Sequence, residues 1–301
     1  MSYRVADITS SNDFAFRINT QKGRLSVLQE QITTGKRINR ASDDPEGAEI
    51  LLGLRTSQTE IKQFQRSSQA AAQKLTAADD TLNSYETILE RVRTLVTQGL
   101  SDTTTQDSKN ALATELETLR TRILNISNTK NNGEYLFGGT RQDAAPFDPS
   151  TSAPAASATT SQFVQIEPGA NAIKVGVTAD TIFSDATSTI FTDLTAGIAA
   201  LRGTGNAATD RTTLENTSLR LGVYTELENN ARAIVGANMN AADIAKDNLS
   251  ANFLSFDDRA NDIEGTDFAA TAVALTDAQR ALDATLQVAA KGRRSLFDFL
   301  G

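Results

Sequence analysis

The sequence predicts a mainly α-helical protein, an elongated antiparallel helical bundle or coiled coil of N- and C-terminal arms with a small β-containing insert. One proline lies at position 45 and the other four lie between residues 146 and 168, so residues 46–145 and 169–301 contain none. Because proline breaks helix interiors, both stretches permit long helices. Hydrophobic residues make up 39% of the chain but aromatic residues only 6%, which favours helix packing through Leu, Ile, Val and Ala.

A hydrophobic heptad repeat predicts a helix from about residue 46 to 98. One series steps by seven from Leu54 to Val96, and a second, offset by three, runs from Ile50 to Val92. Three polar groups interrupt the series, at Ser57, Ser68 and the hydroxyl of Tyr85. A repeat held this long is typical of a left-handed coiled coil. Such a helix is roughly 80 Å long at ~1.5 Å per residue, so we expect a partner along it and a rod-shaped molecule.

Capping residues mark where this helix begins and ends. Asp44 is a candidate N-cap, Pro45 suits the first helical position, and Glu46 complements the helix dipole in the first turn. Gly99 and the polar residues that follow predict its end. A second, antiparallel helix carries Leu112, Leu116, Leu119, Ile123 and Ile126 and stops at the turn signal Asn131-Asn132-Gly133.

The next segment has a different pattern and predicts the small β-rich insert. Val164 and Ile166, then Ile173, Val175 and Val177, alternate around residues 167–171, which predicts one hairpin. Residues 149–161 are only Pro, Ser, Thr and Ala and are typical of a linker or loop. A short helix over 191–202 is expected to end at Gly203.

Helical periodicity returns from about residue 210 and changes frame at Glu264–Gly265, so two helical segments are expected. A matching amphipathic segment precedes Gly35 near the N-terminus. The two terminal stripes could pair with each other, but we favour packing between subunits because both are short and isolated by breaks. The predicted assembly seam comprises Ile18, Leu25, Leu28, Ile32, Phe268, Leu275, Leu282 and Leu296.

These patterns divide the chain into three expected domains. Residues 1–44 and 265–301 form a terminal-helix assembly domain, and residues 45–140 and 205–264 form a helical rod domain. Residues 141–204 form the insert domain.

Composition excludes several classes of function. The chain has no histidine and no cysteine, which removes Ser-His-Asp triads, thiol nucleophiles and ordinary zinc sites, although paired carboxylates or a Ser–Lys pair stay open. The net charge of −8 argues against nucleic acid as a partner. We expect no cofactor, no metal, no membrane insertion and no cleaved signal peptide. Asp43-Asp44 fits a helix cap better than a calcium or acid/base pair.

Three separated motifs resemble those of bacterial flagellins and their relatives. The first is Gln29-Glu-Gln-Ile-Thr-Thr-Gly-Lys-Arg-Ile-Asn39 followed by Ser42-Asp-Asp-Pro45. The second is Asn128-Thr-Lys-Asn-Asn-Gly-Glu-Tyr-Leu-Phe-Gly-Gly-Thr-Arg141 with Pro146-Phe147. The third is Ala281-Leu-Asp-Ala-Thr-Leu286 with Ser295-Leu296 and Phe299-Leu300. The resemblance covers roughly residues 1–148 and 205–301, and the Asp-Asp-Pro form is most similar to the hook–filament junction branch.

The resemblance implies a structural, non-enzymatic protein of the bacterial flagellum that contributes to motility. It also implies an extracellular location, reached through the flagellar type III export apparatus, and assembly through the terminal helices. The implied partners are neighbouring copies, a second hook–filament junction protein, flagellin or the filament cap, and an export chaperone.

Three other functions are considered beside the hook–filament junction. A flagellin that forms the filament itself shares the same helical core. An enzyme in residues 141–205 would have to work without His, Cys or Tyr, since that segment contains none. A cytosolic coiled-coil signalling rod would remain inside the cell.

Overall fold

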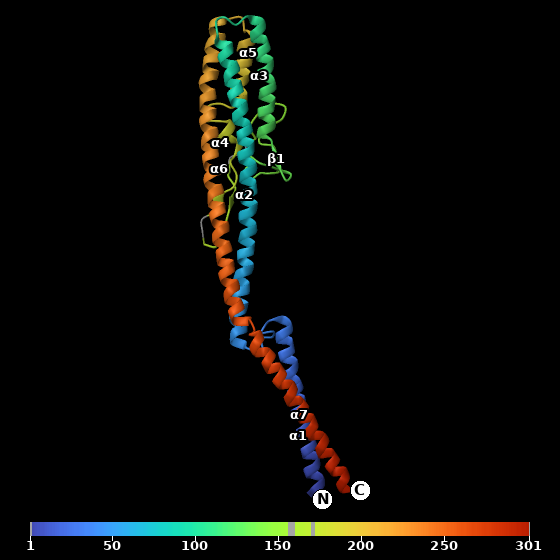
Figure 1. Cartoon of the computed structure of the whole chain (residues 1–301). Helices are drawn as coiled ribbons and strands as arrows, with labels where there is room; N and C mark the ends of the chain where they lie inside the picture. Colours follow the sequence, from blue (N-terminus) through green and yellow to red (C-terminus); the bar gives the residue numbers. More distant parts are fainter. Residues whose placement is uncertain (1, 156–159, 170–171, 301) are drawn as a thin grey trace. The chain divides into compact units, whose positions relative to one another are not determined.

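The computed structural model describes residues 2–155, 160–169 and 172–300, although the side chains of residues 2–12, 289 and 291–300 are not described. Long helices dominate these residues (Figure 1). The helices are α1 (Ser2–Thr34), α2 (Pro45–Leu100), α3 (Gln106–Ser127), α4 (Ala179–Phe183), α5 (Ile190–Arg202), α6 (Ala207–Glu264) and α7 (Phe268–Leu300). The short strands are β1 (Lys130–Asn131), β2 (Glu134–Tyr135), β3 (Phe163–Val164) and β4 (Ile173–Lys174). The expected mainly α fold with a small β-containing insert is confirmed.

The chain forms two compact units. The larger unit comprises residues 61–251, and the smaller one combines residues 1–60 with 252–301. Helices α2 and α6 contribute to both units, because each runs through a boundary between them. The three-domain division expected from the sequence stays a prediction.

The heptad repeat of α2 forms much of the core of the larger unit. Both series are buried over most of their length: Ile61, Ser68, Leu75, Leu82, Leu89 and Val96 in one, Ala71, Ala78, Tyr85 and Val92 in the other. On α6, Val235, Ala242 and Leu249 are buried as the repeat predicts. The polar member Ser68 donates a hydrogen bond of 2.8 Å to the Ala242 carbonyl, so it joins α2 to α6 instead of interrupting the seam.

The heptad series is wrong at the start of α2. Ile50 is exposed, whereas Leu51, one residue further on, is buried with Ile38 and Ala260. The buried stripe therefore includes Leu51 in place of Ile50, while Leu54 packs against the same cluster as the series predicts.

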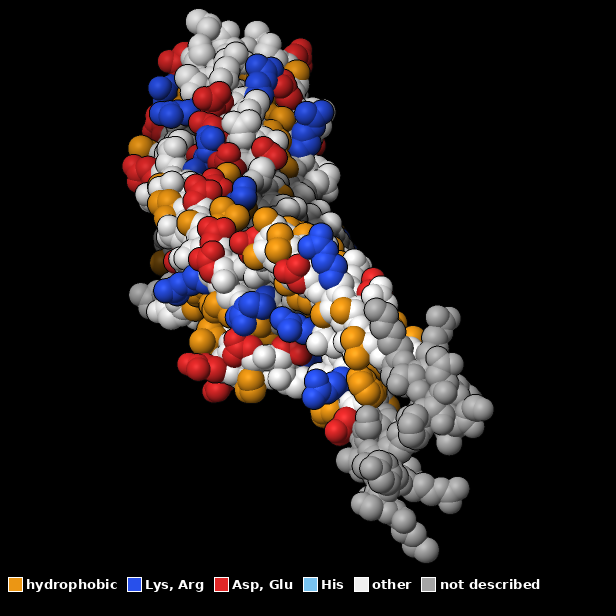
Figure 2. Space-filling view, turned by 60° about the horizontal axis from the view of Figure 1, so that its bottom comes forward, with side chains coloured by type: hydrophobic (Ala, Val, Ile, Leu, Met, Phe, Trp, Pro, Cys, Tyr) orange, Lys and Arg blue, Asp and Glu red, His pale blue; other side chains and the backbone are white. Residues whose placement is uncertain are grey.

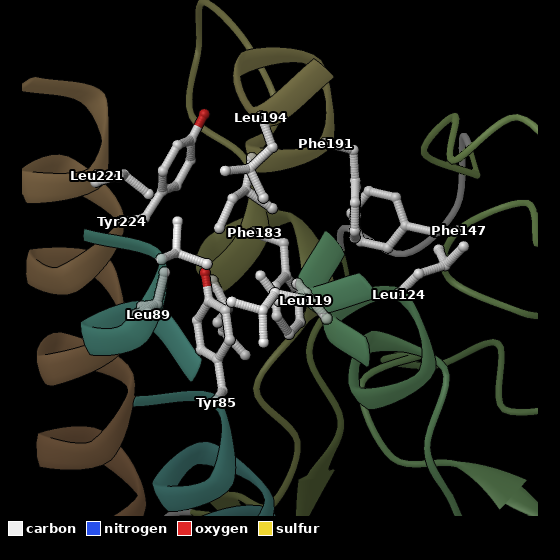
Figure 3. Close-up of a cluster of buried hydrophobic side chains, with 14 of the residues drawn as sticks. Tyr85, Leu89, Leu119, Leu124, Phe147, Phe183, Phe191, Leu194, Leu221 and Tyr224 are labelled. Atoms are coloured by element: carbon white, nitrogen blue, oxygen red, sulfur yellow. The ribbon is translucent and has the colours of Figure 1, made fainter. Parts of the chain in front are cut away.

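Aromatic rings from the insert complete the core of the larger unit (Figure 3). Phe183 of α4 lies edge-on to Tyr85, with ring centroids 4.7 Å apart, and also contacts Phe137 and Phe147. Phe147 contacts Phe191 of α5, which packs beside α3. The sequence predicted α5 and its end at Gly203 but not α4, whose five residues are too few to show a helical period.

Two hairpins account for the described strands. The predicted pairing in the insert is confirmed, because β3 and β4 are antiparallel with Val164 opposite Ile173. The turn at Asn132-Gly133 is confirmed, and both residues have the positive φ angles of a tight hairpin turn, but α3 ends before this turn, at Ser127. The sequence did not predict that strands β1 and β2 flank this turn.

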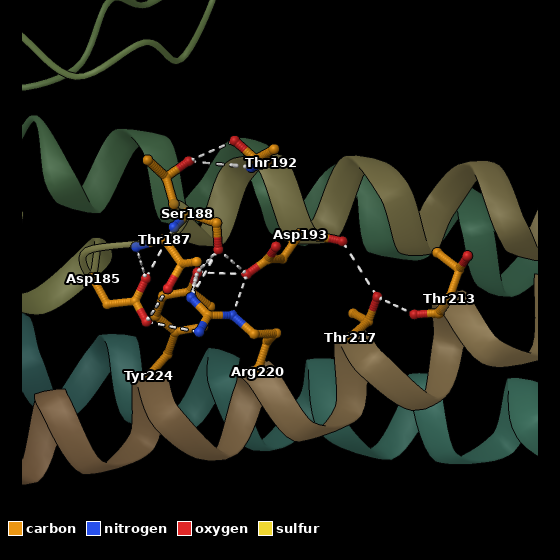
Figure 4. Close-up of polar contacts among 10 residues, drawn as sticks. Asp185, Thr187, Ser188, Thr192, Asp193, Thr213, Thr217, Arg220 and Tyr224 are labelled. Atoms are coloured by element: carbon orange, nitrogen blue, oxygen red, sulfur yellow. Dashed lines mark hydrogen bonds and ion pairs between the residues drawn. The ribbon is translucent and has the colours of Figure 1, made fainter.

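A polar network fastens the insert to α6 (Figure 4). The Arg220 guanidinium donates to Asp185 at 2.7 Å and to Asp193 at 3.0 Å, and also to the hydroxyls of Ser188 and Tyr224. The Tyr224 hydroxyl donates to Asp193 at 2.6 Å. Burial and the bond to Asp193 raise the pKa of Tyr224 to about 12, while Arg220 and nearby backbone amides lower the pKa of Asp185.

Replacing Arg220 should loosen this attachment. We expect Arg220→Met to lower the free energy of unfolding by about 2 kcal/mol, because two carboxylates lose their shared, mostly buried partner. Urea unfolding followed by circular dichroism measures the change. Arg211→Met is the matched control, since Arg211 makes its ion pairs on the surface, and an equal loss in both variants would contradict the prediction.

Candidate assembly site

The terminal helices α1 and α7 pack against each other in the smaller unit. Four predicted seam residues of α1, Ile18, Leu25, Leu28 and Ile32, are half-buried, as are Leu275 and Leu282 of α7. The structure therefore brings the N-terminal and C-terminal stripes together within one chain, which is the alternative to the favoured packing between subunits. Whether these residues also contact other subunits stays a prediction.

The last two predicted seam residues differ from the others. Phe268 is 56% exposed, although its ring lies only 3.5 Å from the position that a Cβ at Gly35 would occupy. The side chain of Leu296 lies outside the described residues, as does that of Ala289.

A second set of apolar side chains on this helix pair is open to solvent. Phe16 and Val27 of α1 and Val273, Leu286 and Val288 of α7 are exposed, Phe16 by 73% and Val273 by 63%. Figure 2 shows hydrophobic side chains along the described part of the molecule up to the grey atoms. These exposed apolar side chains are candidates for contact with a neighbouring subunit.

A single heptad stripe on each helix does not include these residues, so the predicted seam left them out. Val273 lies two residues before Leu275, and Val288 six residues after Leu282, so both lie on another side of α7. A helix with apolar residues on more than one face buries more than one face. That wider distribution was the signal available in the sequence.

The segment after α1 and the segment before α7 are hydrogen-bonded to each other. Gly35, with φ +70°, ends α1, and Lys36 forms an antiparallel bridge with Gly265. The Arg37 amide donates to the Glu264 carbonyl at 2.6 Å, and the Thr266 amide donates to the Gly35 carbonyl at 3.1 Å. This joint, residues 35–37 with 264–266, fixes the end of α1 beside the start of α7.

Glu264 is the charged centre of the joint. Its side chain is mostly buried, and its carboxylate pairs with Lys36 at 2.7 Å and with Arg55 of α2. Arg37 donates to the Ile263 carbonyl at 2.9 Å. Three cations from the N-terminal part of the chain therefore hold the end of α6.

The two aspartates before Pro45 accept hydrogen bonds from nearby backbone amides. The Gly47 amide donates to Asp44 at 2.9 Å, which confirms Asp44 as the N-cap of α2. This bond and that from Arg37 lower the pKa of Asp44. Asp43 accepts from the backbone amides of Asn39 and Arg40 and so closes the loop before the helix.

Removing the Glu264 charge should open the joint. We expect Glu264→Gln to lower the local free energy of opening by about 1 kcal/mol, a modest value because Lys36 and Arg55 are largely solvated. Hydrogen exchange at the amides of residues 37 and 266 measures this change. Exposed Glu49 provides the matched variant Glu49→Gln, and unchanged protection in Glu264→Gln would refute the prediction.

Metal sites and membrane spans are both absent from the described residues. No group of three or more carboxylates among them is arranged to hold a metal ion. None of the helices, as far as they are described, is both long and apolar enough to cross a bilayer.

Comparison with known proteins shows what the N-terminal part of the chain is similar to. The family model of the bacterial flagellin N-terminal helical region matches residues 8–142. Residues 8–142, called the flagellin-type region from here on, are similar to that N-terminal helical region. The resemblance drawn from the sequence motifs of residues 29–45 and 128–141 is thereby confirmed.

Curated relatives of this chain include hook-associated proteins as well as flagellins. Flagellar hook-associated protein 3 of Salmonella typhimurium is 31% identical over 135 residues, which cover 44% of this chain and 43% of that protein. A flagellin of Clostridium tyrobutyricum is 30% identical over 132 residues, covering 44% of this chain and 35% of that protein. The matched segments thus span less than half the length of these relatives.

Solved structures extend the likeness in fold beyond the flagellin-type region. The flagellar junction protein FlgL of Legionella pneumophila aligns with a TM-score of 0.59 at 14% identity, covering 72% of this chain and all of that one. At this identity the likeness concerns the fold alone. It supports the same arrangement of long helices with an insert between them.

Proposed function

We propose that the chain is a structural subunit of the bacterial flagellum that acts as the hook–filament junction adaptor. The observation that carries the proposal is the similarity of this chain to hook-associated protein 3, which is stronger than its similarity to the flagellins. The fold shared with a flagellar junction protein supports it. We expect no catalytic activity.

Assembly in this proposal uses the terminal helix pair. A subunit that joins a tube needs apolar surface that stays open until neighbours cover it. The exposed residues of α1 and α7 fit that need, and the predicted seam residues Leu275 and Leu282 hold the two helices together. Burial of the exposed apolar residues of α1 and α7 against neighbouring subunits would then stabilise the assembly.

The partners follow from the same proposal. They are neighbouring copies of this chain, a second junction protein on the hook side, and flagellin or the filament cap on the other. Export through the flagellar type III apparatus with an export chaperone would place the protein on the outside of the cell.

A flagellin that forms the filament itself is the second candidate, because flagellins are also similar to this chain. Self-assembly distinguishes the two. The purified chain is incubated with and without flagellar seeds and precipitating salt, then followed by light scattering and negative-stain microscopy. A junction subunit should stay monomeric alone and bind hook ends, whereas long filaments of this chain would establish a flagellin and overturn the junction proposal.

A further inference from the structure

Glu228 is a fully buried carboxyl group in the core of the larger unit. It lies on α6, one turn from Tyr224, and has no exposed surface. Neither of its side-chain oxygens has a hydrogen-bond partner among the described residues, and the same holds for the Tyr85 hydroxyl of α2. Burial raises the pKa of Tyr85, and the charges of Tyr224 and Glu228 raise it further.

The charges around Glu228 favour its neutral form. Arg232 of α6 approaches Glu228 at 3.7 Å, beyond hydrogen-bond distance. The same guanidinium is closer to two carboxylates of α2, Glu86 at 2.5 Å and Asp79 at 3.4 Å. One cation is therefore shared by three acids, and the buried one has the weakest contact with it.

We propose that Glu228 is a proton-controlled element of the fold: protonated, it is accommodated between α2 and α6, and its ionisation weakens the packing of these helices around Tyr85 and Tyr224. Burying an unpaired carboxylate is costly, whereas a neutral carboxyl group can be buried at much lower cost. This role is independent of the proposed place of the protein in the flagellum.

The sign of the effect follows from proton linkage. Burial and the charge of Glu86 raise the pKa of Glu228 to about 7, above the value of 4.5 for a free glutamate. The folded state therefore binds more protons than the unfolded state between these two values, so stability falls as the pH rises through that window and is constant above it. The equilibrium constant for unfolding should rise about fortyfold between pH 5 and pH 7.

The composition makes this window easy to observe. The chain has neither histidine nor cysteine, whose side chains ordinarily titrate near neutral pH. Three of the four tyrosines, including Tyr85 and Tyr224, belong to the larger unit, and there is no tryptophan. Tyrosine emission therefore follows mainly the unit that contains Glu228.

The test is urea unfolding of the full chain at half-unit steps from pH 5 to pH 8, monitored by tyrosine emission. We expect the fortyfold change in the wild type and in Glu226→Gln, whose side chain lies two residues away. Glu228→Gln, neutral at every pH, should show little change across the range. A flat wild-type profile, or the same slope in Glu228→Gln, would overturn the proposal.

A direct titration keeps the proposal testable if Glu228→Gln does not fold. Carbon-13 NMR of the wild-type side-chain carboxyl groups should show a resonance that titrates above pH 6. If every carboxyl resonance titrates below pH 5.5, Glu228 ionises like a solvated glutamate and the proposal fails.

Discussion

Aspartate at both Val273 and Leu286 should abolish incorporation at hook ends while leaving the chain folded. Both side chains are exposed in the isolated chain, so the charges cost little there. In the proposed assembly the two aspartate carboxylates would be buried against a neighbouring subunit with no opposite charge to pair with. Each buried aspartate would cost about 3 kcal/mol, and each such cost weakens binding by roughly a hundredfold.

The measurement is binding of the purified variant to isolated hook ends by electron microscopy, with circular dichroism as the check on folding. Val273→Ile with Leu286→Met keeps the apolar surface and should bind as the wild type does. If the aspartate variant bound hook ends normally, the exposed residues of α1 and α7 would have no part in assembly.

Aspartate at Leu275 and Leu282 should have a different effect. These half-buried residues belong to the helix that packs on α1, so the charges should separate α1 from α7 within the chain and also block incorporation. Hydrogen exchange should accelerate in residues 14–32 and stay slow around Tyr85 in the larger unit. Protection retained in α1 would show that Leu275 and Leu282 do not hold the pair together.

Phe183→Ala should destabilise the larger unit more than Arg220→Met does. Phe183 is fully buried and contacts the rings of Tyr85, Phe137 and Phe147. Truncation removes apolar burial and leaves a cavity among close-packed rings, which costs about 4 kcal/mol.

Urea unfolding measures this loss, and Phe163→Ala is the matched control. Phe163 belongs to the same insert but is 61% exposed, so its truncation should cost less than about 1 kcal/mol. Similar losses in the two variants would mean that the ring cluster does not stabilise the larger unit.

The sequence alone determined the long helices and their ends. The Asp44-Pro45 cap and the Gly203 stop act through neighbours within a few residues, and the heptad repeat of α2 is a periodic pattern along one helix. Such signals depend on local backbone geometry and on periodicity, both of which can be read without knowing the fold. The motifs around residues 29–45 and 128–141 resemble those of flagellins, and the matching family model covers both motifs.

Only the tertiary structure decided which apolar residues are covered. It pairs α1 with α7, shifts the buried stripe from Ile50 to Leu51, and places the five residues of α4 in the core. It also isolates the Glu228 carboxyl group from hydrogen-bond partners among the described residues. Burial is a property of contacts between segments far apart in the chain, so a helical period shows that a face is apolar but not which surface covers it.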